Sequence, residues 1–129
     1  MKRTCCAAFG AVLAGILLST GAQAFDWYTG DYEKCSVKES TADIVECVGD
    51  LVAHWDARLN DAYKETMSSQ TGARAKTLRD AQRAWIAWRD ANCGWYRAGE
   101  GTIAAIEGNA CIYALTRDRA VELETYVGQ

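Results

Sequence analysis

Apolar side chains recur at three- and four-residue steps along three long stretches of this chain, and this period restricts its fold more than any other feature. The first stretch is predicted to begin as a helix near Ser40, because Ser40 and Asp43 approximate a capping box. It ends in the segment 68–72, where serines, a threonine and a glycine interrupt the pattern. Its predicted apolar face consists of Ile44, Val48, Leu51, Trp55, Leu59 and Ala62.

A second and a third helix are predicted further along the chain. The second runs from Ala73 to about Tyr96 and is ended by the glycine-rich segment 99–101, since glycine readily adopts the left-handed conformation. Its expected inner face consists of Leu78, Ala81, Trp85, Trp88 and Asn92. The third runs from about Gly108 or Asn109 to Tyr126. One side of it consists of Cys111, Leu115, Thr116, Arg119, Glu122, Leu123 and Tyr126.

The remaining segments carry no sign of a sheet. Residues 25–39 read as an irregular arm, and residues 102–107 fit either a helical turn or a loop. The sequence has no proline, and it shows no internal repeat and no strand-like alternation of useful length. We therefore predict an all-α fold, a small antiparallel three-helix bundle.

The first 24 residues are typical of a secretory signal peptide. Lys2 and Arg3 precede a short apolar run, and Ala22-Gln23-Ala24 fits the small-x-small cleavage pattern. The apolar run is shorter than the ~20 residues that cross a bilayer, and no lipid-attachment cysteine follows it. We expect cleavage after Ala24, a single helical domain over residues 25–129, a periplasmic or secreted location, and no stable membrane anchor.

Four cysteines remain after that cleavage: Cys35, Cys47, Cys93 and Cys111. An even number in a small exported domain predicts two disulfides. A zinc site is disfavoured, because no C-x-x-C pair exists and His54 is the only histidine. The preferred pairing is Cys35 with Cys47 and Cys93 with Cys111, since each closes a short loop. Cross-pairing is nearly as easy in a bundle, so the sequence leaves the connectivity open.

Charge is unevenly distributed along the predicted mature chain. Residues 25–66 hold 10 acidic and 4 basic side chains, whereas residues 67–129 hold 7 and 8. An acidic half disfavours nucleic acid and anionic lipid as partners and favours a basic protein through electrostatic steering. Ordinary solubility explains the same charge equally simply.

No pattern for catalysis is found. Nucleophilic catalysis needs a base beside a serine or cysteine, and His54 lies in a helix without a partner motif. No serine lies in a G-x-S-x-G motif, and the acidic segment 99–101 is unsuited to phosphate. We expect no catalytic residue, metal or cofactor, and therefore no enzyme.

Polar residues lie within or beside the apolar stripes. They are Asn60, Gln82, Arg89, Arg119 and Glu122. Arginine and glutamate are rarely buried unless paired, so we interpret this set as a structural network between helices. A binding site for a polar ligand is the less favoured alternative.

Aromatic residues gather near the predicted cysteine end of the bundle. Trp27, Tyr28, Trp95 and Tyr96 lie in the arm or beside the glycine-rich segment, which also carries Glu100. Aromatic residues with a polar rim are typical interface anchors, so these five are candidates for binding a partner protein. Packing over the disulfides is an equally weighted explanation.

Several of these residues form a recognisable pattern. Leu59-Asn60-x-x-Tyr63 is followed by a segment from Leu78 to Cys93 that contains Gln-Arg-Ala-Trp-Ile, and later by Thr116-x-x-Arg119-x-x-Glu122-Leu123. The pattern resembles the LprI-type lysozyme inhibitor domain between Cys35 and Leu123. The resemblance implies a cysteine-stabilised helical envelope domain and an inhibitor of lysozyme. Together with the acidic amino-terminal half, it leads us to expect a basic lysozyme as the protein partner. An envelope interaction or stress module of the same fold without that inhibition is the alternative.

Overall fold

A computed structural model of the protein describes residues 27–129, and this part of the chain is helical without strands. The helices are α1 (Tyr32–Ser36), α2 (Thr41–Ser69), α3 (Gly72–Arg97) and α4 (Ile103–Glu124). The predicted all-α class is confirmed. The prediction of three helices was incomplete, because the segment expected to be irregular contains the short helix α1. The predicted signal peptide, residues 1–24, lies outside the described residues.

The boundaries of α2 follow from its sequence. The Ser40 Oγ accepts a hydrogen bond of 3.1 Å from the Asp43 backbone N–H and donates one of 2.7 Å to Asp43 Oδ2. Because this pair satisfies an orphan donor at the helix start, the expected capping arrangement is confirmed. The helix ends at Ser69, within the segment expected to break it, and α3 begins after the short turn at Thr71.

The inner face of α3 differs from the predicted one. Ala81 is exposed and Trp88 is 49% exposed, whereas Gln82 is buried and Arg89 is half-buried. The sequence placed Ala81 and Trp88 on the inner face, and it placed Gln82 and Arg89 in a polar network between helices. Gln82 and Arg89 face α4, where each finds a hydrogen-bond partner, and Trp88 is turned to solvent.

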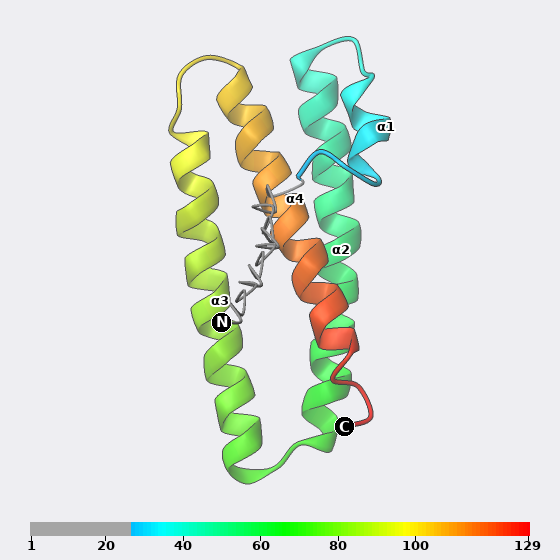
Figure 1. Cartoon of the computed structure of the whole chain (residues 1–129), viewed down its shortest axis with the longest axis vertical. Coiled ribbons are helices and arrows are strands. Elements are labelled where there is room, and N and C mark those ends of the chain that lie inside the picture. The colour runs from blue at the N-terminus through cyan, green and yellow to red at the C-terminus, as the bar shows by residue number, and fades with distance from the viewer. Residues whose placement is uncertain (1–26) are drawn as a thin grey trace, which may run out of the picture.

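Helix α4 is the centre of the fold. It packs against both α2 and α3, which contact each other far less than either contacts α4 (Figure 1). It begins at Ile103, earlier than the expected Gly108 or Asn109, and ends at Glu124, before the expected Tyr126. Its buried positions face several directions: Ala104, Gly108, Ala110, Cys111, Tyr113, Ala114, Leu115, Thr116, Arg119, Ala120 and Leu123.

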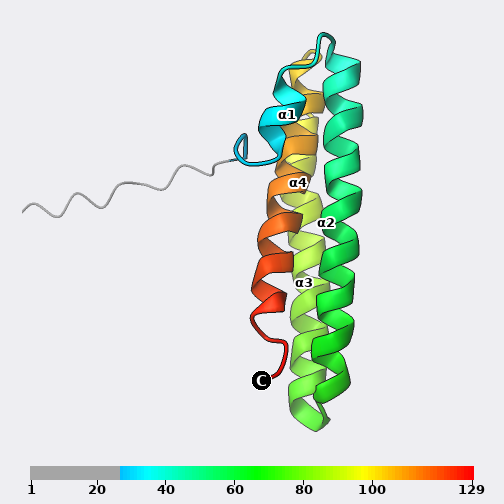
Figure 2. The ribbon, with the colours of Figure 1, turned by 90° about the vertical axis from the view of Figure 1, so that its right-hand side faces the viewer.

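The three long helices alternate in direction, and the α2–α3 hairpin extends beyond the last turn of α4 (Figures 1 and 2). One apolar cluster, around Val48 and Tyr113, lies toward the end where α2 begins. A second, smaller cluster contains Leu59, Ala62, Ala120 and Leu123. Within residues 27–129, no helix combines the length and apolar character that crossing a membrane requires.

Two disulfides fasten the first cluster. Cys35–Cys47 joins α1 to α2, and Cys93–Cys111 joins α3 to α4, which is the pairing preferred from the sequence. Cys35, Cys93 and Cys111 are fully buried. The bridges thus fasten α1 to α2 and α3 to α4 at one end of the molecule, here called the disulfide end.

Candidate functional site

Aromatic side chains at the disulfide end contact one another in a chain. The Trp27 and Tyr96 rings lie edge to face with centroids 4.4 Å apart, and the Trp95 and Tyr96 rings do so at 4.8 Å. Trp27 is 8% exposed and forms the base of this group, whereas Trp95 is 74% exposed. The sequence-predicted candidates therefore divide into a buried support, Trp27, and a projecting ring, Trp95.

Tyr28 lies at the edge of the same region. It is 45% exposed, and its ring packs edge to face on Tyr32 at 5.0 Å. Burial raises the pKa of the Tyr28 hydroxyl, and the negative charge of Glu107 raises it further. Tyr28 is therefore a neutral hydrogen-bonding group beside a carboxylate at physiological pH.

A shallow hollow of about 280 Å³ adjoins the projecting ring. Trp95, Tyr96 and Gly99 line it together with the carboxylate-bearing side chain of Glu107. Glu100, the acid singled out from the sequence, is exposed in the turn before α4 and does not line the hollow. Glu107 was missed because α4 was expected to start after it. A helix start at Ile103 would have placed Glu107 one turn inside, facing the end of α3.

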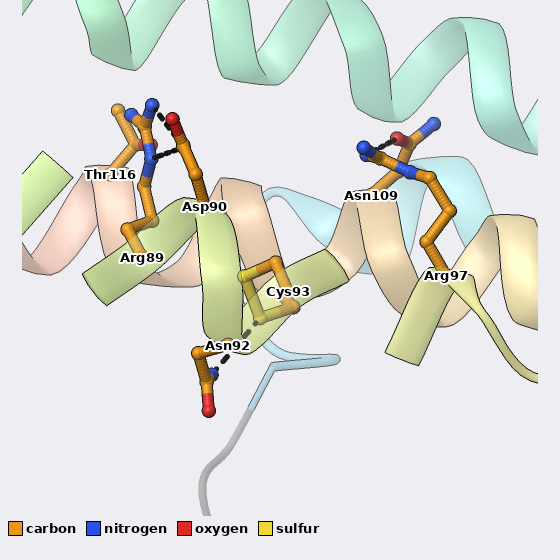
Figure 3. Close-up of a disulfide and its surroundings, with 8 residues drawn as sticks. Arg89, Asp90, Asn92, Cys93, Arg97, Asn109 and Thr116 are labelled. Carbon is orange, nitrogen blue, oxygen red and sulfur yellow. Dashed lines mark hydrogen bonds and ion pairs between the residues drawn. A yellow bond between two sulfur atoms is a disulfide. The ribbon is translucent and has the colours of Figure 1, made fainter. Parts of the chain in front are cut away.

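Close to Glu107 in the sequence, α3 and α4 are in direct contact through Arg97 and Asn109 (Figure 3). Arg97 Nη2 donates a hydrogen bond of 3.0 Å to Asn109 Oδ1, and a Cβ added to Gly108 would lie 2.9 Å from the Arg97 Cβ. The two helices therefore approach each other closely where Arg97 of α3 meets Gly108 and Asn109 of α4. The Cys93–Cys111 disulfide lies beside it, so the hollow is bounded by a rigid frame.

An acidic face lies nearby at the start of α2. Glu39, Asp43, Glu46 and Asp50 line a depression of about 460 Å³ next to the 79%-exposed Val37. The spacing of Asp43, Glu46 and Asp50 places these three on one side of α2, and Glu39 lies just before the helix. The excess negative charge of the amino-terminal half is thus partly concentrated on one surface.

Three of the five predicted network residues meet. Arg119 Nε donates to Gln82 Oε1 at 2.9 Å, and Arg119 Nη1 donates to Glu122 Oε2 at 2.7 Å. Tyr126 OH donates to the other Glu122 oxygen at 2.6 Å. This hydrogen bond lowers the pKa of Glu122, and Arg119 lowers it further.

The other two residues bond elsewhere. Arg89 donates to Thr116 Oγ1 at 3.3 Å and to Asp90 Oδ1, so it joins α3 to α4 separately (Figure 3). The Asn60 amide donates to the backbone oxygen and the carboxylate of Asp56. The network expected as one unit therefore consists of three local groups.

His54 is exposed on α2, with its ring edge to face on Trp55 at 5.7 Å. No cluster of three or more His, Cys, Asp or Glu side chains within residues 27–129 is placed to hold a metal ion. What the disulfide end offers chemically is apolar contact, a carboxylate and hydrogen bonds.

These features define the class of protein. The chain is a small all-helical domain that is fastened by two disulfides and carries an exposed aromatic and acidic surface. Residues 33–123 match the family model described as lysozyme inhibitor LprI. The chain belongs to this family, as the resemblance between Cys35 and Leu123 predicted. No curated protein and no solved structure gave a significant match.

Proposed function

We propose that this protein inhibits lysozyme by binding it through the disulfide end. The observation that carries the proposal is the projection of Trp95, 74% exposed, over the hollow that Glu107 lines. Membership of the lysozyme inhibitor LprI family supports a lytic enzyme as the partner. No covalent chemistry is invoked, since an inhibitor needs only to occupy the enzyme.

Trp95 is suited to be an interface anchor. A large aromatic side chain buries much apolar area, and its edge-to-face contact with Tyr96 restrains it before binding. Because Tyr96 is itself supported by Trp27 and by the rigid α3–α4 contact, little conformational entropy is lost on association. Glu100, exposed in the adjoining turn, and Glu107 supply carboxylates for donors on the partner.

The acidic face of α2 supports a basic partner. Lysozymes of the animal type are generally basic, and negative charge around Asp43 and Glu46 accelerates the encounter with such a protein. This effect acts on the association rate and is screened by salt over about 8–10 Å near physiological ionic strength. We therefore expect association to slow steeply as salt is raised, while dissociation changes little.

Export would bring the inhibitor to its target. We propose that cleavage after Ala24 releases residues 25–129 into the periplasm or the medium. The two disulfides support this, because such bridges persist in oxidising compartments. Amino-terminal sequencing of the protein recovered from its native compartment tests it: Phe25 is expected first, and retention of residues 1–24 contradicts it.

Inhibition of muramidase by the purified, oxidised residues 25–129 is the direct test. Trp95→Ala is expected to weaken inhibition at least about tenfold, the loss typical of an interface hot spot. Trp88→Ala is the matched control, because Trp88 is an exposed tryptophan of the same helix that does not line the hollow. Equal inhibition by the parent and Trp95→Ala would rule out this surface. Absence of inhibition by the parent would favour the envelope interaction module instead.

A further inference from the structure

A second recess lies between α2 and α3, away from the aromatic hollow. It has a volume of about 330 Å³ and is lined from α2 by Asn60 and Tyr63 and from α3 by Gln82 and Trp85. This volume is at the lower end of the range for sites that hold small molecules. It is too small for a partner helix, which needs a long apolar groove. We refer to it as the α2–α3 groove.

Gln82 presents an ordered donor to this groove. The side chain is only 6% exposed, and its Oε1 is held by the 2.9 Å hydrogen bond from Arg119 Nε. Among residues 27–129, its amide nitrogen has no hydrogen-bond partner, yet it is not sealed from solvent. The bond to Arg119 engages the amide oxygen, so the N–H₂ group of this groove-lining residue remains without a partner within residues 27–129.

Two guanidinium groups add positive charge at the rim. Arg79 and Arg83 are exposed, lie one turn apart on α3 and both line the groove. Neither has a carboxylate partner among the described residues, whereas Lys76 on the same helix pairs with Asp80 at 2.6 Å. Because the predicted mature chain is acidic overall, this unpaired basic pair marks the groove as a place for an anion.

The acceptors that line the groove suit a ligand that donates hydrogen bonds. Asp56 and Asn60 line it, and no donor within residues 27–129 bonds to Asp56 Oδ1 or Asn60 Oδ1. A phosphate-rich ligand presents acceptors almost alone and would leave these two oxygens unpaired. A sugar supplies hydroxyl donors, and Tyr63 and Trp85 supply the aromatic surface on which its apolar faces pack.

We propose that the α2–α3 groove binds an acidic sugar. Arg79 and Arg83 hold the carboxylate, the Gln82 amide donates to a ring or hydroxyl oxygen, and Asp56 and Asn60 accept from hydroxyls. Arg79 and Arg83 make no ion pair within residues 27–129, and lysozyme inhibition does not require them, because a positive groove repels a basic protein. The proposal is therefore independent of the proposed inhibitor function.

Calorimetric titration of the oxidised residues 25–129 with two matched sugars tests this site. N-acetylmuramic acid carries a carboxylate that N-acetylglucosamine lacks, so the acid is expected to bind at least about tenfold more tightly. Equal binding of the two sugars, or no heat from the acid up to about 10 mM, would overturn the proposal. Comparable binding of inorganic phosphate would overturn the assignment to a sugar.

Variants locate the binding. Arg79→Gln with Arg83→Gln is expected to weaken binding of the acid at least about tenfold, whereas Arg74→Gln, on the same helix outside the groove, leaves it unchanged. Gln82→Glu keeps an oxygen for Arg119 but replaces the donor by a negative charge, so it is expected to abolish binding with the helical content retained. If Arg74→Gln weakens binding as much as the double variant, the groove is not the site. Muramidase inhibition by the double variant should equal that of the parent.

Discussion

Arg119 Nε lies 2.9 Å from Gln82 Oε1, and this hydrogen bond joins two buried polar side chains across the α3–α4 interface. Arg119 is 8% exposed and keeps its charge satisfied through Gln82 on one side and Glu122 on the other. Burying an arginine is costly unless it is paired and hydrogen-bonded. The central helix of the fold is therefore positioned by a polar contact as well as by apolar packing.

Removing the acceptor from this pair should destabilise the domain. Gln82→Leu leaves Arg119 Nε without its partner, and an unsatisfied buried donor of this kind costs about 1–3 kcal/mol. Gln82→Glu retains an acceptor and is expected to lose less. Urea unfolding of the oxidised proteins measures both. A Gln82→Leu protein as stable as the parent would show that the contact contributes nothing to stability.

The hydrogen bond between Tyr126 and Glu122 predicts a pH dependence. Because the folded pKa of Glu122 lies below its unfolded value, its ionised form stabilises the fold above about pH 4.3, and the contribution is lost as the pH falls through the lowered folded pKa. The same hydrogen bond raises the pKa of Tyr126. The contribution of Tyr126 to stability is therefore lost only as the pH rises past about 10. The stability difference between the parent and Tyr126→Phe should therefore shrink from pH 7 to pH 3. Thermal unfolding across this range measures it, and a constant difference would contradict the assignment.

The two disulfides should differ in their resistance to reduction. Cys93 and Cys111 are both fully buried, whereas Cys47 is half-buried and lines the acidic depression. Thiolate attack needs access to sulfur, so Cys35–Cys47 is expected to be reduced first. Limited reduction followed by alkylation and mass spectrometry gives the order, and earlier loss of Cys93–Cys111 would contradict it. Loss of each bridge should lower the free energy of unfolding by about 2–4 kcal/mol.

Local signals in the sequence were sufficient to predict much of the fold. Ser40 and Asp43 located the start of α2, and the serine and glycine segment located its end, because caps and turns depend on a few neighbouring residues. The disulfide pairing was also the preferred one, since short loops favour local bridges in an antiparallel arrangement. These features need no knowledge of what packs against them.

Features that depend on tertiary packing were harder to predict. Helix α4 is buried on several sides, so it has no single apolar stripe, and its early turns could not be told from a loop. Trp88 was expected inside because it is apolar, yet it is exposed. Gln82 was expected in a polar network between helices, but the sequence could not reveal which members of that set meet, since that depends on how α3 and α4 pack. At the candidate site, Trp95 and Tyr96 were found from their aromatic character. Glu107 was not, because its position depends on where α4 begins.

The close approach of α3 and α4 at Gly108 gives a further prediction. An added Cβ would lie 2.9 Å from the Arg97 Cβ and 3.2 Å from the Arg97 Cα, and a backbone atom cannot move aside as a flexible side-chain end can. Gly108→Ala should therefore cost about 1–3 kcal/mol through overpacking.

Gly49→Ala on α2 is the matched control for this change, because a Cβ there meets nothing within 4 Å. That substitution should stabilise the domain by about 0.5–1 kcal/mol, since alanine loses less backbone entropy than glycine in a helix. Urea unfolding compares the two variants with the parent. Opposite signs are expected, and a stabilising Gly108→Ala would mean that the helices separate at little cost. Because Gly108 adjoins Glu107, the same substitution should also weaken muramidase inhibition if the hollow at the disulfide end binds the enzyme, whereas Gly49→Ala should leave inhibition unchanged.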